Sequence, residues 1–307
     1  MYLAIKCAIS DSPFQELAMP ILYRFPNLAN LSTALFASLM ALMPLANPAQ
    51  AQVVAGPAAP IEPSYVELVE LALAADIVAR VQIDDQATLR AERAPDVAPG
   101  KVRIYAESIT QALLGGRIAI GESLAFLVDL PADARGRAPK LKKQVFLIFA
   151  RSVEGRPGQV YLAGQGAMQP ATPALEQRVR QVLTQLAESA RPPVITGVRE
   201  AMSVPGNLVG ESETQIFLET RSGDPVSLSV IRRPGMTAQW GVSWTDIVDQ
   251  AARPPQAQTL EWYALACFLP ADLPEDAFIQ RDRESRDRAR EDYRMVLGQL
   301  GPCVRNN

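Results

Sequence analysis

The chain has 307 residues, of which 48% are hydrophobic and 21% are charged, and its formal net charge is −3. This composition is typical of a globular protein, and the slight acidic excess excludes the concentrated basic footprint that nucleic-acid binding needs. Histidine is absent, which excludes Ser-His-Asp and Cys-His catalysis and the histidine ligands of most catalytic zinc and non-haem iron sites.

Residues 1–51 are predicted to be a signal peptide. Leu31 to Met43 form an apolar run of suitable length, and Ala49 to Ala51 provide the small residues that signal peptidase reads, so we expect cleavage after Ala51. Met19 is an alternative start that gives a signal of ordinary length. A membrane anchor is disfavoured because the apolar core is shorter than the roughly 20 residues that a span needs. The sequence therefore predicts a periplasmic or secreted protein with no membrane span after cleavage.

The first half of the mature chain is predicted to be a β module over residues 64–171, after an Ala- and Pro-rich linker over residues 52–63. Ser64 is placed to cap a short helix that ends near Asp76. A polar loop is expected over residues 84–100, between the first two strands. β-branched and alternating residues predict strands over residues 77–83, 102–114, 124–128, 145–150 and 160–163, and the fourth of these, apolar on both faces, is expected to be central and covered on both sides.

A connecting helix is predicted over residues 172–191, with Thr172 as its N-cap and Pro173 at its first position. Residues 192–307 are then predicted to form a second, α+β domain that opens with residues 194–204. Its alternating segments 214–220, 226–230 and 240–244 indicate an antiparallel meander, and helices over 259–269 and 282–300 close the chain. The expected fold class is α+β: an open β-barrel-like module, a linking helix, and a meander with C-terminal helices.

The cysteines predict one disulfide. Cys7 lies in the leader, so the mature chain retains Cys267 and Cys303, and an even pair in an exported chain is typical of a disulfide. This bond would tie the two C-terminal helices together, and two free buried thiols are the alternative. We expect no metal and no cofactor, since two cysteines alone cannot complete a zinc or iron-sulfur site and no phosphate-binding glycine motif occurs.

Four segments of the first half resemble a netrin-like or OB-type β-barrel. They are ADIVARVQI, KVRIYAESITQALLGG, GESLAFLVDLP and KKQVFLIFARSV. The first cysteines of the eukaryotic netrin-like modules are missing, which counts against the inhibitor function of those modules. Two longer phrases, GVREAMSVPGNLVGESETQIFL and LEWYALACFLP, resemble uncharacterised exported proteins of Gram-negative bacteria. That resemblance implies a periplasmic location and no assigned activity.

The strongest local charge cluster lies between the third and fourth predicted strands. A loop of this composition could bind a phosphate, a lipid headgroup or an acidic glycan, although a short charge run by itself favours an ordinary solvated loop. The candidate binding residues are Arg135, Arg137, Lys140, Lys142 and Lys143.

Two other sets of residues allow different functions. The carboxylates Glu211, Glu213, Asp246 and Asp249 could in principle support glycoside hydrolysis, but we favour the interpretation that they are exposed acids at strand ends. Four aromatic residues could form a binding platform, namely Trp240, Trp244, Trp262 and Tyr263, but the alternation of Trp240 with Trp244 on one strand favours the core.

No catalytic residue is assigned. We therefore favour a non-catalytic periplasmic binding or interaction protein whose partner is an envelope protein or an anionic envelope component. A carboxylate hydrolase and a structural envelope component are the alternatives.

Overall fold

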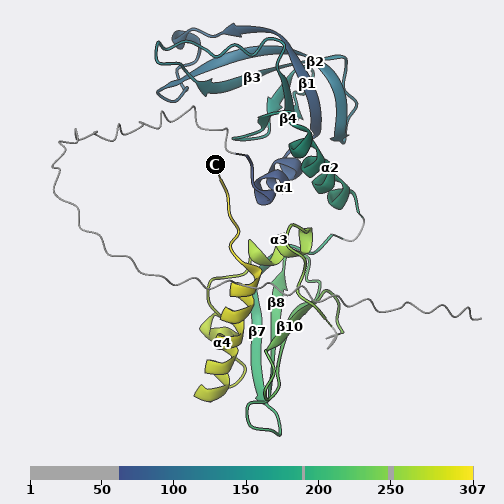
Figure 1. Ribbon diagram of the computed structural model, residues 1–307, viewed down its shortest axis with the longest axis vertical. Coiled ribbons are helices and arrows are strands. Elements are labelled where there is room, and N and C mark those ends of the chain that lie inside the picture. The colour runs from purple at the N-terminus through teal and green to yellow at the C-terminus, as the bar shows by residue number, and fades with distance from the viewer. Residues whose placement is uncertain (1–61, 189–190, 248–251, 307) are drawn as a thin grey trace, which may run out of the picture. The chain divides into compact units, whose positions relative to one another are not determined.

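A computed structural model of the chain describes residues 62–188, 191–247 and 252–306, all within one compact unit, Ala58–Asn307. The predicted export segment, its cleavage site and most of the predicted linker lie outside the described residues. Antiparallel sheets and α-helices make up the described part, which confirms the α+β class. The helices are α1 (Tyr65–Ala74), α2 (Pro173–Ala187), α3 (Leu260–Ala266) and α4 (Arg283–Leu300) (Figure 1).

The first sheet has the strand order β3-β2-β1-β4-β5, and β6 pairs with β4. The central strand β1 runs on through Asp84 to Thr88, where the sequence predicts a loop, so that expectation is wrong. These residues are mostly exposed, so apolar burial does not explain why they form a strand. They are in a strand because they pair with β2 beyond a bulge after Ile83. The strands are β1 (Ile77–Thr88), β2 (Lys101–Gly116), β3 (Ser123–Pro131), β4 (Val145–Ser152), β5 (Val160–Leu162) and β6 (Met168–Pro170).

Strand β4 is covered on both faces, as predicted. Phe146 and Ile148 belong to a core enclosed by the first sheet. Leu147 and Phe149, on the opposite face, pack in a second core with side chains of α1 and α2. Figure 1 shows these two helices next to each other against the sheet. The alternating apolar run therefore supplies two cores at once.

The first sheet is not closed by a continuous ladder. Its edge strands β3 and β5 meet in one parallel bridge, Ala125 with Gln159, beside which the Ala125 N–H donates to the Gly158 carbonyl at 2.8 Å. In the part of the chain that the structure describes, β3 and β5 pair nowhere else. The barrel-like character of this module remains a prediction.

The helices of the first region begin where the sequence predicts. Ser64 and Glu67 form a reciprocal capping box at the start of α1, in which the Ser64 N–H donates to Glu67 Oε2 at 2.7 Å and the Glu67 N–H to Ser64 Oγ at 3.2 Å. Thr172 caps α2, with Pro173 at the first helical position. Among the described residues, no helix is long and apolar enough to cross a membrane.

The second sheet is an antiparallel meander, as predicted, in the order β10-β9-β8-β7. Strand β7 is the first strand of this sheet in the chain and lies at one edge of it. The core on one face combines Ile216 and Leu228 of the sheet with Tyr293 and Val296 of α4. The strands are β7 (Ile195–Pro205), β8 (Ser212–Thr220), β9 (Val226–Arg232) and β10 (Gln239–Ser243).

A buried carboxylate joins α4 to this sheet. The Asp292 side chain is fully buried, and it accepts hydrogen bonds from Arg232 Nε at 2.6 Å and from Thr214 Oγ1 at 2.5 Å. Thr214 Oγ1 also lies 2.9 Å from the buried Ser203 Oγ. The network therefore connects α4 with β7, β8 and β9, and it satisfies a charge that would otherwise be costly to bury.

Candidate functional site

The predicted cationic cluster lies in the connection between β3 and β4, which we call the basic loop (Arg135 to Lys143). The loop begins within a tight turn built on Asp133, whose carboxylate accepts hydrogen bonds from the backbone N–H groups of Arg135 and Arg137 at 2.8 and 2.9 Å. Gly136 allows this turn because its φ of 74° lies in the left-handed region. These bonds, first of all the one from the Arg137 backbone, lower the pKa of the Asp133 carboxyl.

The far end of the basic loop is anchored to the first sheet. Leu141 is only 4% exposed and packs into the core that the first sheet encloses. Gln86 of β1 holds the backbone on either side of it, because its amide donates to the Pro139 carbonyl at 2.9 Å and accepts from the Leu141 N–H at 2.5 Å. The Lys143 N–H donates to the Ile83 carbonyl at 2.7 Å. The loop is therefore fixed by its backbone and one apolar side chain, which leaves its charged groups outside.

All five predicted binding residues are exposed, and the structure divides them into two groups. Arg137 pairs with Asp133 at 2.8 Å, and Lys142 lies 3.5 Å from Asp85 of β1. Among the described residues, no carboxylate forms an ion pair with the remaining three, Arg135, Lys140 and Lys143.

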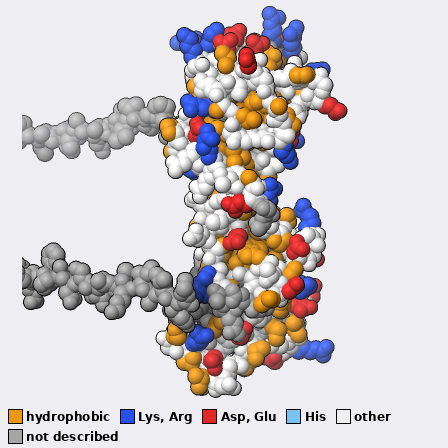
Figure 2. All heavy atoms as spheres, turned by 90° about the vertical axis from the view of Figure 1, so that its right-hand side faces the viewer, with side chains coloured by type: hydrophobic (Ala, Val, Ile, Leu, Met, Phe, Trp, Pro, Cys, Tyr) orange, Lys and Arg blue, Asp and Glu red, His pale blue; other side chains and the backbone are white. Residues whose placement is uncertain are grey.

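Lys101 extends the cationic character of this end of the sheet. It begins β2, where it is paired with Pro131 at the end of β3, and the Ala132 N–H donates to the neighbouring Gly100 carbonyl at 2.9 Å. Figure 2 shows lysine and arginine side chains interspersed with aspartate and glutamate over the end of the view that carries the first sheet. The attraction between such exposed charges and a ligand is largely screened beyond one Debye length, which is about 8 Å at physiological ionic strength. The loop is thus suited to direct contact with an anion.

Two of the candidate carboxylates, Glu211 and Glu213, line one pocket of the described residues, and Asp246 is not part of its lining. Glu211 braces the turn between β7 and β8, because its carboxylate accepts from the N–H groups of Asn207 and Leu208 at 3.0 and 3.2 Å. Glu213 accepts a hydrogen bond from the Gln215 amide at 2.6 Å. Asp249 lies outside the described residues. No group of three or more Cys, Asp or Glu side chains that could hold a metal ion occurs in the described part of the chain.

The tryptophans lie mainly in the core. Trp240 is 4% exposed and donates from its indole Nε1 to Gln299 Oε1 of α4 at 2.9 Å, and Trp244 packs against the same core. Trp262 of α3 donates to the Leu300 carbonyl at 2.8 Å. These contacts favour the interpretation of Trp240 and Trp244 as core residues over a binding platform.

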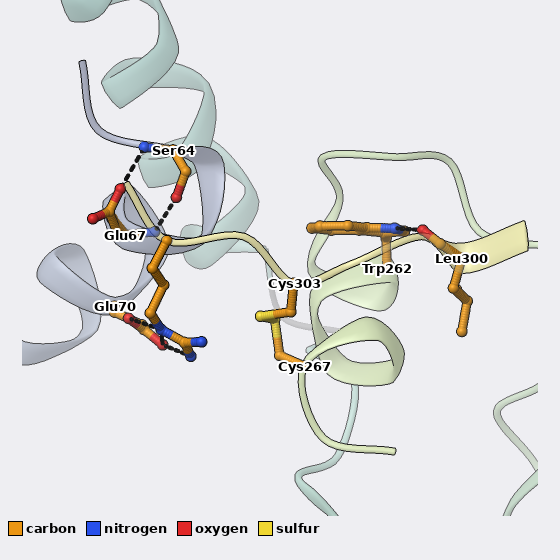
Figure 3. The surroundings of a disulfide bond; sticks show 8 residues. Ser64, Glu67, Glu70, Trp262, Cys267, Leu300 and Cys303 are labelled. Atoms are coloured by element: carbon orange, nitrogen blue, oxygen red, sulfur yellow. Dashed lines mark hydrogen bonds and ion pairs between the residues drawn. A yellow bond between two sulfur atoms is a disulfide. The ribbon is translucent and has the colours of Figure 1, made fainter. Parts of the chain in front are cut away.

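Cys267 and Cys303 are joined, as the sequence predicts, with their sulfur atoms 2.09 Å apart (Figure 3). Cys267 is the C-cap of α3, and Cys303 follows the end of α4. Beyond the disulfide, the guanidinium of Arg305 forms an ion pair with Glu70 of α1 at 2.5 Å, and the Asn306 amide donates to the Glu62 carbonyl at 2.9 Å. The sequence carries no signal for this contact, because it joins residues 235 positions apart.

The comparisons with known proteins leave the family open. No protein-family model and no curated protein matches the chain. The function therefore has to be argued from the residues and contacts described above.

Proposed function

We propose that the chain is an exported, non-catalytic binding protein, and that its basic loop contacts an anionic component of the cell envelope. The observation that carries this proposal is the combination of a fixed backbone with exposed charge. Leu141 and Gln86 hold the loop in place, while all five of its cationic side chains reach solvent. A loop that is ordered before binding loses less conformational entropy when a ligand binds.

The charge distribution supports an anion as the ligand. Within the described residues, Asp133 and Asp85 pair with two of the five cations, and Arg135, Lys140 and Lys143 form no ion pair there and could bind phosphate or carboxylate groups. Arginine can bind such groups through two parallel hydrogen bonds, and lysine acts as a compact point charge. Because all of these groups are exposed, the attraction is screened by salt.

The test is vesicle co-sedimentation of the mature protein. Vesicles containing phosphatidylglycerol should bind the protein, vesicles of phosphatidylcholine alone should not, and added salt should release it. In the variant Arg135→Ser, Lys140→Ser and Lys143→Asn, binding should be roughly a hundredfold weaker, at about 1 kcal/mol per cation near an anionic membrane surface. Asparagine is chosen at position 143 because φ there is 69°, a conformation that asparagine tolerates.

A matched control removes the same charge elsewhere. Arg221, Arg233 and Arg281 are exposed and belong to the second half of the chain. Their replacement by serine should leave vesicle binding close to that of the parent protein. Equal losses of binding in both variants would show that only the net charge of the protein matters. Unchanged binding in the loop variant would contradict the proposed role of the loop. An acidic polysaccharide, assayed in parallel, distinguishes a glycan ligand from a lipid headgroup.

Export is tested independently of binding. N-terminal sequencing of the protein recovered from a periplasmic extract should begin at Gln52. A product that retains residues 31–43 and fractionates with membranes would contradict the proposed cleavage.

A further inference from the structure

A cavity of about 570 Å³ lies where the C-terminal ends of α1 and α2 meet the first sheet. On the sheet side it is lined by the start of β1 and the end of β2, which lie side by side because Ile77 pairs with Gly116. Its volume falls in the range of roughly 300–1,000 Å³ that is typical of ligand pockets. The five cations of the basic loop do not line it, so this cavity is a candidate site of its own.

The inside of the cavity is aliphatic. Val78 and Leu186 are buried members of the core that α1 and α2 form with the first sheet. Leu114 and Leu183 are partly buried against the same core, and Leu73 remains 47% exposed. Among the described residues that line the cavity, none is aromatic, so a planar ligand would find no ring to stack on. The lining therefore favours a flexible hydrocarbon chain.

The polar part of the lining is rich in arginine. Arg117, Arg180 and Arg191 line the cavity, and Asp76 is the one carboxylate among its described lining residues. Arg117 uses a single nitrogen, Nη2, to donate to Asp76 Oδ1 at 2.8 Å and to the Ala75 carbonyl at 3.2 Å. Its side chain stays 69% exposed, which leaves further N–H groups accessible to a ligand.

The positive charge of the other two arginines is incompletely balanced. Glu176 of α2 pairs with Arg180 at 2.8 Å and also with Arg80 at 3.3 Å, so one carboxylate serves two guanidinium groups. Arg191 is exposed, and within the described residues no carboxylate forms an ion pair with it. The cavity therefore combines an apolar interior with an excess of positive charge among its exposed lining residues.

We propose that this cavity binds an amphiphile with a single hydrocarbon chain and an anionic head group. The chain covers the apolar lining and releases water from it, and the carboxylate or phosphate head meets Arg180 and Arg191. Arginine suits both head groups because its planar guanidinium can donate two parallel hydrogen bonds. A neutral hydrocarbon would leave the arginines unused, and a small hydrophilic anion would leave the leucines in water. The proposal does not depend on the basic loop, and either can fail without the other.

The first test titrates the mature protein with laurate, below its micelle concentration, in a calorimeter. Dodecyl phosphate, measured in parallel, shows which head group is preferred. Affinity should fall by up to about fourfold for each methylene removed from the chain, the limit for full burial. Butyrate keeps the head without the chain, and dodecyltrimethylammonium keeps the chain with the opposite charge. Both should bind more weakly than laurate by about tenfold or more.

Two results of this titration would overturn the proposal. One is binding of dodecyltrimethylammonium as tight as that of laurate and dodecyl phosphate, which would show that the arginines do not select the head group. The other is the absence of binding by both anionic amphiphiles.

The second test removes positive charge from the cavity. Arg180→Gln with Arg191→Gln should weaken laurate binding about tenfold. The matched control, Arg221→Gln with Arg281→Gln, removes two exposed arginines of the second half and should bind like the parent. Equal losses in the two double variants would assign the effect to net charge and contradict a head-group site at the cavity.

The third test fills the cavity. Ala187 is exposed and lines the cavity, so Ala187→Trp should abolish laurate binding, whereas Ala174→Trp, at an exposed position of α2 outside the lining, should not. Parental affinity in a folded Ala187→Trp protein would contradict the proposal. If Ala187→Trp does not fold, NMR of the parent protein decides, because laurate should shift the amide signals of Gly115, Gly116 and Thr184. Laurate binding that leaves all three signals in place would overturn the assignment of the ligand to this cavity.

Discussion

The two sheets differ in the kind of side chain that they bury against their helices. On the first sheet, both faces of β4 bury only apolar side chains, and the ion pairs of Arg103 with Asp96 and Asp129 keep contact with solvent. On the second sheet, α4 brings the fully buried carboxylate of Asp292 onto the strands. Apolar burial is tolerant of small shifts, whereas a buried ion pair requires particular partners at particular positions. Side-chain shape therefore positions α1 and α2, and a charge pair helps to position α4.

The largest effect should follow from breaking this charge pair. Asp292→Ala leaves the Arg232 guanidinium without its buried partner and is expected to lower the free energy of unfolding by about 3–5 kcal/mol. The neighbouring Glu291 also pairs with Arg232, at 3.1 Å, but its side chain is 70% exposed. Glu291→Ala should therefore cost less than about 1 kcal/mol. Urea unfolding of both variants measures the contrast, and similar losses would show that burial does not distinguish the two acids.

The disulfide should come next. Its cysteines are 36 positions apart, and closing a loop of that length contributes about 4 kcal/mol in the chain-entropy treatment. Cys267→Ser with Cys303→Ser should lower the melting temperature of the non-reduced protein. Reducing agent should have the same effect on the parent and none on the variant. An unchanged melting temperature on reduction would contradict this expectation.

The first sheet should respond to the loss of apolar volume. Leu147 of β4 is fully buried against α1 and α2, and Leu147→Ala is expected to cost about 3 kcal/mol through lost burial and the cavity left behind. Leu147→Met, which keeps most of the volume, should cost less than about 1.5 kcal/mol. Denaturant unfolding compares the two. Equal losses of unfolding free energy in the two variants would show that packing around β4 does not tolerate small changes of side-chain shape.

The smallest effect is expected at alkaline pH, and it involves one tyrosine in each region. Burial raises the pKa of Tyr65 and of Tyr293, whose hydroxyls donate to Gln185 Oε1 and to the Pro270 carbonyl, both at 2.6 Å. Since the folded-state pKa values lie above the unfolded value of about 10, this stability is fully present below about pH 10 and is lost as the pH rises further. Unfolding free energies measured across this range should fall, and Tyr293→Phe should reduce the fall. A flat profile in the parent protein would contradict the prediction.

Several features could be read from the sequence because they depend on local patterns. The capping residues Ser64 and Thr172 mark the starts of α1 and α2, and alternation marks the doubly covered strand β4 and the meander. The pairing of Cys267 with Cys303 followed from the cysteine count and the expected compartment. The five cations of the basic loop were also visible as a cluster. In each case the relevant residues are close in sequence or few in number.

Other features depend on segments that are distant in sequence, and only the tertiary structure determined them. Asp85 neutralises Lys142 because β1 runs five residues beyond its apolar part, and Glu70 meets Arg305 only after the chain has folded. The burial of Asp292 likewise requires the second sheet to be assembled against α4. Periodicity and capping act within a few residues, whereas these contacts depend on which distant residues the packed cores bring together.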